Sequence, residues 1–128
     1  GAVFISVKDS DKTGAVEAAR ELVALGFTLV ATSGTAAHLE AEGLPVRSIN
    51  KVNEGQPHIV DAMINGEIQL VFNTTEGATS IADSASIRRT AVGHKIPYYT
   101  TLAASIASVR AITSMTSREI SVRALQSA

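Results

Sequence analysis

Short apolar runs alternate with segments of helical periodicity along the whole chain, and this alternation most restricts the fold. Runs typical of buried strands occupy residues 3–7, 27–32, 46–49, 68–72 and 96–99. Apolar residues recur at helical spacing in residues 12–25, 36–42, 57–64, 80–92 and 103–115, and a weaker element occupies 120–122. Because each right-handed crossover returns the chain over the sheet, we expect an α/β fold. The predicted architecture is a three-layer α/β/α, doubly wound, parallel sheet of five strands in the order 3-2-1-4-5.

Residues that start or stop helices mark the ends of the predicted helices. Either Ser10 or Asp11 is expected to cap the helix at 12–25, and Thr100-Thr101 the helix that starts at 103. Proline is favoured in the first turn, so Pro57 is expected at the first helical position of its helix. Glycines that end helices are expected at Gly26, Gly43, Gly66 and Gly93.

The composition is that of one domain with almost no net charge and no cysteine. With 128 residues, 45% of them hydrophobic, the chain can bury one core. A formal net charge of −1 provides no global field for nucleic acid or an anionic membrane, and no stretch approaches the roughly 20 apolar residues of a membrane span. The lack of cysteine excludes disulfides and thiolate metal sites, and suits a cytoplasmic protein. Because the first strand begins almost at residue 1, we expect residues 1–128 to be a single domain cut from a longer chain.

A strand that runs into a hydroxyl- and glycine-rich turn, residues 27–35, is the strongest candidate for a binding site. The helix that follows has free amide groups and a positive dipole end, which favour phosphate or carboxylate. Thr32, Ser33 and Thr35 offer hydroxyl donors, and Gly34 lets a ligand approach the backbone. Plain capping of the helix by these hydroxyls explains the same residues, so both interpretations stay open.

The other polar clusters also follow strands, and so they fall at the same edge of a parallel sheet. Lys12 and Lys51 lie in strand-end loops from which an ammonium group can reach a phosphate. Asn73 and Thr75 suit a ribose or a base edge, or they satisfy turn amides. Neither Arg88 nor Arg89 is assigned to the site, because adjacent helix residues point about 100° apart, and surface or interdomain ion pairs explain them.

Catalytic signatures are absent from the sequence. The histidines His38, His58 and His94 have no metal-like spacing. No nucleophile elbow, phosphate-binding lysine loop or Gly-x-Gly-x-x-Gly motif follows any predicted strand. The pattern therefore favours a binding crevice over a reaction centre.

Several segments, in this order, resemble a known family. They are Ser-Val-Lys-Asp-Ser-Asp-Lys at 6–12, Ala-Thr-Ser-Gly-Thr at 31–35, Asn-Lys-Val-Asn-Glu-Gly-Gln-Pro-His-Ile at 50–59, Asn-Thr-Thr-Glu-Gly at 73–77, Ile-Arg-Arg at 87–89 and Tyr-Tyr-Thr-Thr at 98–101. From residue 4 to about residue 122 the chain resembles the C-terminal allosteric domain of the carbamoyl phosphate synthetase large subunit, which has the methylglyoxal synthase-like fold. The segments at 50–59 and 73–75 are the most specific.

The resemblance implies a regulatory site and assigns residues to it. The implied ligand is a nucleotide monophosphate, UMP or IMP, or phosphate itself, with ornithine at the border to the catalytic body. The matching nucleotide positions are Ser6, Lys12, Thr32, Thr35, Lys51, Val52, Asn73 and Thr75, and the positions facing ornithine are Tyr98 and Thr100. Departures from the enteric pattern occur at Ser33, Pro97, Tyr99 and residues 103–105. These leave the nucleotide pocket intact and leave the effector undecided.

The resemblance also implies what surrounds the domain. The domain itself would need no cofactor and no catalytic residue, whereas the full-length ligase uses ATP, Mg and Mn or K. Its partners would be the catalytic domains of the same large subunit and the glutaminase small subunit. Alternatives are a stand-alone methylglyoxal synthase-type lyase acting on a triose phosphate, the related IMP cyclohydrolase domain, and a structural domain with an empty crevice. The lyase's Gly-Pro-x-Gly-Gly-Asp segment is absent here.

Overall fold

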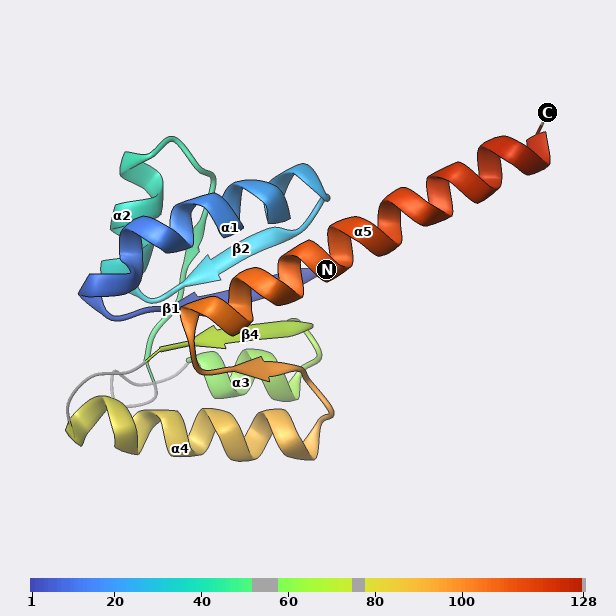
Figure 1. Cartoon of the computed structure of the whole chain (residues 1–128). Coiled ribbons are helices and arrows are strands. Elements are labelled where there is room, and N and C mark those ends of the chain that lie inside the picture. Colours follow the sequence, from blue (N-terminus) through green and yellow to red (C-terminus); the bar gives the residue numbers. More distant parts are fainter. Residues whose placement is uncertain (52–57, 75–77, 128) are drawn as a thin grey trace.

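A parallel sheet built around a buried central strand forms the middle layer of the molecule. The computed structural model describes residues 1–51, 58–74 and 78–127. The strands are β1 (Ala2–Ser6), β2 (Thr28–Ala31), β3 (Arg47–Ser48), β4 (Leu70–Asn73) and β5 (Tyr98–Tyr99). All paired neighbours run parallel, in the order β3-β2-β1-β4-β5 (Figure 1). The strand order predicted from the sequence is therefore confirmed.

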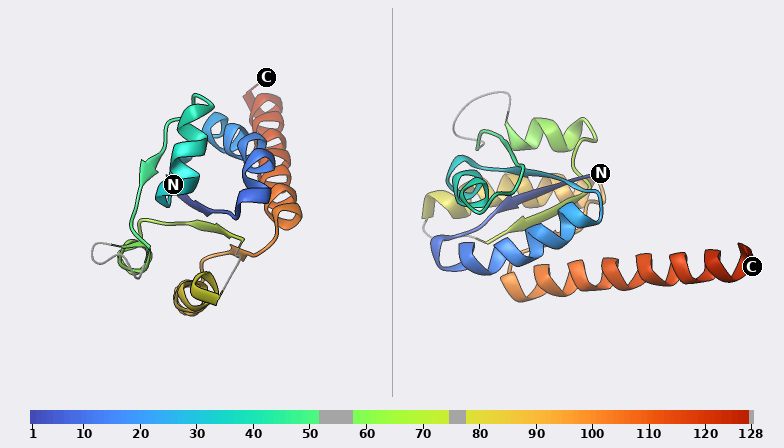
Figure 2. Two further views of the ribbon diagram at one scale, coloured as in Figure 1. Left: turned by 90° about the vertical axis from the view of Figure 1, so that its left-hand side faces the viewer. Right: turned by 90° about the horizontal axis from the view of Figure 1, so that it is seen from above.

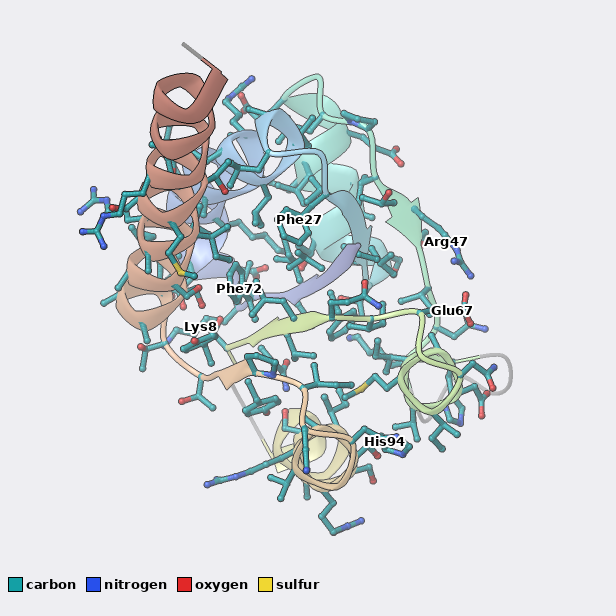
Figure 3. All side chains as sticks on the ribbon, turned by 90° about the vertical axis from the view of Figure 1, so that its right-hand side faces the viewer. Lys8, Phe27, Arg47, Glu67, Phe72 and His94 are labelled. Carbon is teal, nitrogen blue, oxygen red and sulfur yellow. The ribbon has the colours of Figure 1, made fainter. Side chains whose placement is uncertain are left out.

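Helices cover both faces of the sheet and complete the three layers (Figure 2). They are the 3-10 helix η1 (Asp9–Asp11) and the α-helices α1 (Lys12–Ala24), α2 (Ser33–Ala41), α3 (Ile59–Ile64), α4 (Ala78–Gly93) and α5 (Leu102–Ser127). Side chains alternate across a strand, so Val3 and Ile5 of β1 pack under α1, α2 and α5, whereas Phe4 packs under α3 and α4. Figure 3 shows Phe27 and Phe72 on the α1 side of the sheet, where Phe72 belongs to the first of these two cores and the partly buried Phe27 packs against it.

Two helices differ most from the predicted bounds. The helix α2 begins at Ser33 and not at residue 36, because the hydroxyl-rich residues form its first turn and not a loop before it. The C-terminal helix α5 is continuous to Ser127, so the separate element predicted at 120–122 is wrong. No glycine or proline lies between residues 102 and 127 to end it. The far end of α5 projects beyond the body in Figure 1 and in the right-hand view of Figure 2.

The predicted helix ends are right at some positions and wrong at others. Asp11 precedes α1 but makes no side-chain capping bond to any described residue, because η1 leads directly into the helix. At the start of α3 the N-cap is His58. Pro57, predicted at the first helical position, lies outside the described residues. α4 ends at Gly93, as predicted, and the left-handed residue that follows it is Lys95, with φ 57°. Thr101 does cap α5, since its hydroxyl accepts a bond from the amide of Ala104 at 3.1 Å.

Of the helices in the described part of the chain, none combines the length and hydropathy that a bilayer crossing needs.

Candidate functional site

The carboxyl ends of the three central strands lie side by side and bring together four of the predicted site residues. In the register of the sheet, Ser6 of β1 stands opposite Asn73 of β4, and Ile5 stands opposite Ala31 of β2. Thr32 follows β2 directly, and Thr35 lies in the first turn of α2. The topology therefore brings Ser6, Thr32, Thr35 and Asn73 to one edge, as predicted.

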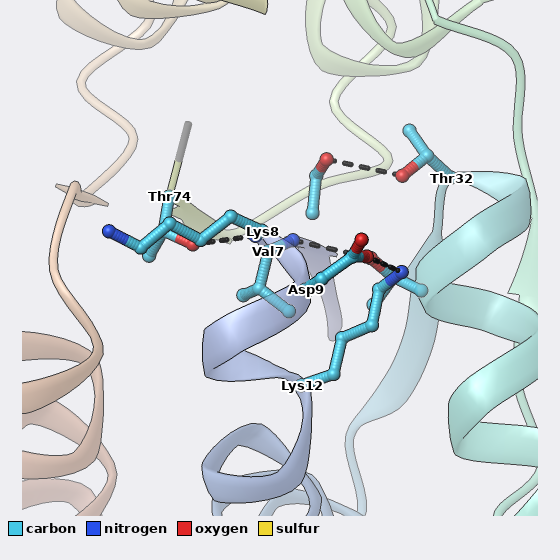
Figure 4. Close-up of polar contacts among 8 residues, drawn as sticks. Val7, Lys8, Asp9, Lys12, Thr32 and Thr74 are labelled. Carbon is cyan, nitrogen blue, oxygen red and sulfur yellow. Dashed lines mark hydrogen bonds and ion pairs between the residues drawn. The ribbon is translucent and has the colours of Figure 1, made fainter. Parts of the chain in front are cut away.

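Hydroxyl groups join the end of β1 to both neighbouring strands (Figure 4). The hydroxyls of Ser6 and Thr32 are 3.1 Å apart. The amide of Val7 donates to Thr35 Oγ1 at 3.2 Å. On the β4 side, the amide of Lys8 donates to Thr74 Oγ1 at 3.0 Å. Thr74 was not predicted as a functional residue, although its position directly after Asn73 in a strand-end turn is the signal that could have identified it.

The N-terminus of α2 lies at this edge, and its first amides have no partner inside the helix. Thr32 is the N-cap residue, with extended backbone angles of φ −68° and ψ 157°, but its side chain makes no capping bond to a described residue. The first bond of the helix runs from the amide of Ala36 to the carbonyl of Thr32 at 2.8 Å. The amides of residues 33–35 consequently have no partner inside the helix. The Thr32 hydroxyl therefore does not serve as a plain cap of the helix, because it contacts Ser6 instead.

An ammonium group stands over this helix terminus. Lys12 Nζ lies 3.4 Å from the position that a Cβ atom on Gly34 would take. The same nitrogen forms a hydrogen bond and ion pair of 2.6 Å with Asp9 Oδ1. The Lys12 side chain is 21% exposed and that of Asp9 is 92% exposed. The hydrogen bond and the charge of Lys12 lower the pKa of Asp9, so Asp9 is ionised at neutral pH.

On the other side of the edge, Asn73 joins β4 to α4 and β5. Its side chain is buried, and its Nδ2 atom donates to Ser84 Oγ at 2.9 Å and to Tyr98 Oη at 3.0 Å. A predicted nucleotide residue and a predicted ornithine-side residue are therefore in direct contact. Ser84, which orients the same amide, was missed because it lies in a helix where serine carries no site signal.

Other predicted residues are placed less closely. Lys51 is exposed and follows the bridge between Asn50 and His58, next to the edge strand β3, at the same end of the sheet. Thr100 is exposed directly after β5. Val52 and Thr75 lie outside the described residues.

A site with these groups suits anion binding better than metal chemistry. It combines one ammonium, a helix terminus and several hydroxyls, which are groups that bind phosphate oxygens. Among residues 1–51, 58–74 and 78–127, no group of three or more His, Asp or Glu side chains is placed to hold a metal ion.

Comparison with known proteins identifies related sequences. The family model described as MGS-like domain matches residues 14–100. The chain is 50% identical over 126 residues to the carbamoyl phosphate synthase large chain of Myxococcus xanthus, which covers 98% of this chain and 12% of the relative. It is 56% identical over 112 residues to the large chain of Pseudomonas aeruginosa, covering 88% and 10%, and 46% identical over 126 residues to that of Mesorhizobium japonicum, covering 98% and 11%. The chain thus spans 10–12% of the length of these relatives.

Proposed function

The chain belongs to the MGS-like domain family, and we propose that residues 1–128 are the single allosteric, effector-binding domain of a carbamoyl phosphate synthase large chain. The proposed effector is a nucleotide monophosphate, UMP or IMP, with phosphate as its anchoring group. The whole enzyme would be the glutamine-hydrolysing, ATP-dependent ligase that makes carbamoyl phosphate for pyrimidine and arginine biosynthesis in the cytoplasm. Its ATP, Mg and Mn or K sites would lie in the catalytic domains, and its glutaminase in a separate small subunit.

The observation that carries the proposal is the placement of Lys12 over the uncapped start of α2. Its ammonium stands against Gly34, where three amides have no helical partner. A phosphate there would meet one full positive charge and the positive end of the helix dipole together. The absent side chain of Gly34 provides the room, since a Cβ atom would lie only 3.4 Å from the ammonium nitrogen.

The remaining parts of the proposed ligand follow from the phosphate position. Asn73 and Thr75 would contact the ribose or base, and Lys51 and Val52 would approach from the β3 side. Ornithine would contact Tyr98 and Thr100. The hydrogen bond of 3.0 Å between Asn73 and Tyr98 supports neighbouring positions for the two ligands.

Calorimetric titration with UMP, IMP and inorganic phosphate tests the proposal. Lys12→Ala and Lys51→Ala should each weaken the phosphate-bearing ligand by about ten- to a hundredfold, since each removes a charge-assisted contact of about 1.5–3 kcal/mol. Arg89→Ala is the matched charge control, because Arg89 is exposed on α4 and bonds only weakly, at 3.4 Å, to Ser86. Unchanged binding in both lysine variants, or a large loss in the Arg89 variant, would contradict the proposed site.

The lyase alternative has one observation in its favour, the carboxylate of Asp9 beside Lys12. A general base works best with a pKa near the working pH, however, and Lys12 lowers the pKa of Asp9. We therefore expect no methylglyoxal from dihydroxyacetone phosphate. Substantial turnover by the purified chain, lost in Asp9→Asn, would replace the binding-domain proposal by the lyase.

A further inference from the structure

The carboxylate of Asp9 holds the same ammonium that the proposed phosphate needs. Asp9 lies in η1, three residues before Lys12, and its Oδ1 atom is 2.6 Å from Lys12 Nζ. Figure 4 shows this pair next to the hydroxyl groups of the strand ends. The ion pair has no formal net charge, so in this arrangement the positive end of α2 is the main remaining attraction for an anion.

We propose that Asp9 is a built-in competitor, an internal anion that a phosphate ligand must displace from Lys12 and that thereby lowers the affinity of the site. This inference rests on the proposed function, because it concerns how tightly the same site binds its effector. It assigns to Asp9 a role in tuning affinity, and neither the family match nor the predicted site residues include one.

The exposure of the two side chains favours exchange over a permanent pair. The Asp9 side chain is 92% exposed, so its carboxylate keeps most of its hydration and can leave the ammonium at low cost. The Lys12 side chain is only 21% exposed and is packed against Gly34, so the ammonium stays at the helix terminus. Phosphate can therefore replace the Asp9 carboxylate on the Lys12 ammonium while the ammonium stays in place.

The difference in charge favours phosphate over the Asp9 carboxylate as the partner of the Lys12 ammonium. A phosphate monoester carries about two negative charges near pH 7 and has three acceptor oxygens, whereas Asp9 carries one charge. The phosphate can also bind the amides of α2, which the carboxylate of Asp9 does not reach through any described hydrogen bond. Because Lys12 keeps the pKa of Asp9 below its usual value, Asp9 competes throughout the neutral pH range.

Removing the charge of Asp9 tests this role directly. Inorganic phosphate and UMP would be titrated into the wild-type chain and into the Asp9→Asn and Asp11→Asn variants, at low and at high salt. Asp9→Asn should bind about three- to tenfold more tightly at low salt, because an exposed ion pair and one like charge are removed, and the gain should shrink at high salt. Asp11→Asn is the matched control, since it removes the same charge from the same 3-10 helix η1, and the Asp11 side chain makes no cap bond among the described residues.

Two further measurements separate competition from a structural effect. In a Lys12→Met background, Asp9→Asn should change the affinity by less than about twofold, because the two residues act through one contact. In the wild-type chain, the pKa of the Asp9 carboxyl, followed by carbon NMR, should rise when phosphate saturates the site, because Lys12 no longer contacts it.

Each outcome is decisive. Weaker binding by Asp9→Asn would mean that Asp9 positions Lys12 for the ligand. Unchanged binding, or an Asp9 pKa that does not change on saturation, would mean that no exchange occurs. Each of these results overturns the inference, and the proposed function stands as long as the wild-type chain binds the ligand. If neither wild type nor Asp9→Asn binds phosphate or UMP, the proposed function and the inference both fall.

Discussion

Substitutions of Thr35 can separate the structural use of its hydroxyl from its use in ligand binding. Thr35 is 3% exposed, and its Oγ1 atom accepts the amide of Val7, itself 8% exposed, at 3.2 Å. Thr35→Val keeps the shape of the side chain but leaves the Val7 amide without an acceptor, which should cost about 1–3 kcal/mol of unfolding free energy. Thr35→Ser keeps the acceptor and loses one methyl group, which should cost about 1 kcal/mol.

Urea unfolding of the two variants gives the comparison. The valine variant should be the less stable, and the slope m of its unfolding free energy against urea concentration should not change. In thermal unfolding, its Tm should fall by about 3–5 °C for each kcal/mol lost. The serine variant should bind phosphate as wild type does, because it keeps the hydroxyl at the start of α2. A valine variant at least as stable as wild type would refute the reasoning, since the Val7 amide would then need no acceptor from Thr35.

Three further substitutions test how the elements around the site are held. Lys95→Gly should stabilise the chain by about 1 kcal/mol in urea unfolding, because Lys95 has φ 57°, a conformation that costs non-glycine residues energy; lower stability would show that its side chain matters more. Gly14→Ala should loosen α5 from α1, because a Cβ atom there would lie 2.5 Å from a methyl carbon of Leu102; Leu102→Ala in the same chain should recover part of the loss, and additive losses would count against this contact. Tyr98→Phe should cost about 0.5–1.5 kcal/mol, because a buried N–H of Asn73 loses its acceptor; an unchanged unfolding free energy would mean that the bond contributes nothing.

The strand order was predictable because it depends on features that are local in sequence. Buried runs, helical periods and helix-ending glycines recur at regular intervals, and Gly26, Gly43 and Gly66 do have positive φ values of 94°, 81° and 76°. The length of α5 was not predictable in the same way. Its first half packs against α1, whereas its far end projects from the body, where serine and threonine lower helix propensity only slightly and do not end the helix.

The site was predictable in its place and its residue types but not in its contacts. Parallel topology brings Ser6, Thr32 and Asn73 to one edge regardless of their rotamers. Which groups they contact depends on side-chain directions and on backbone amides, and neither has a sequence signature. The partner of Thr35 is the amide of Val7, and the partner of Lys12 is Asp9, to which no sequence pattern assigned a role.

The structural use of the hydroxyls bears on where the affinity for phosphate comes from. Of the two hydroxyl protons of Ser6 and Thr32, one is used in the bond of 3.1 Å between them, so the pair keeps one proton for a ligand. Thr35 accepts from Val7 and keeps its own proton. These are neutral donors of about 0.5–1.5 kcal/mol each, so they position an anion more than they hold it. The larger share must come from the ammonium of Lys12 and the amides of α2. The affinity of the site is therefore most sensitive to whatever shares Lys12 with the ligand, and among the described residues that group is the carboxylate of Asp9.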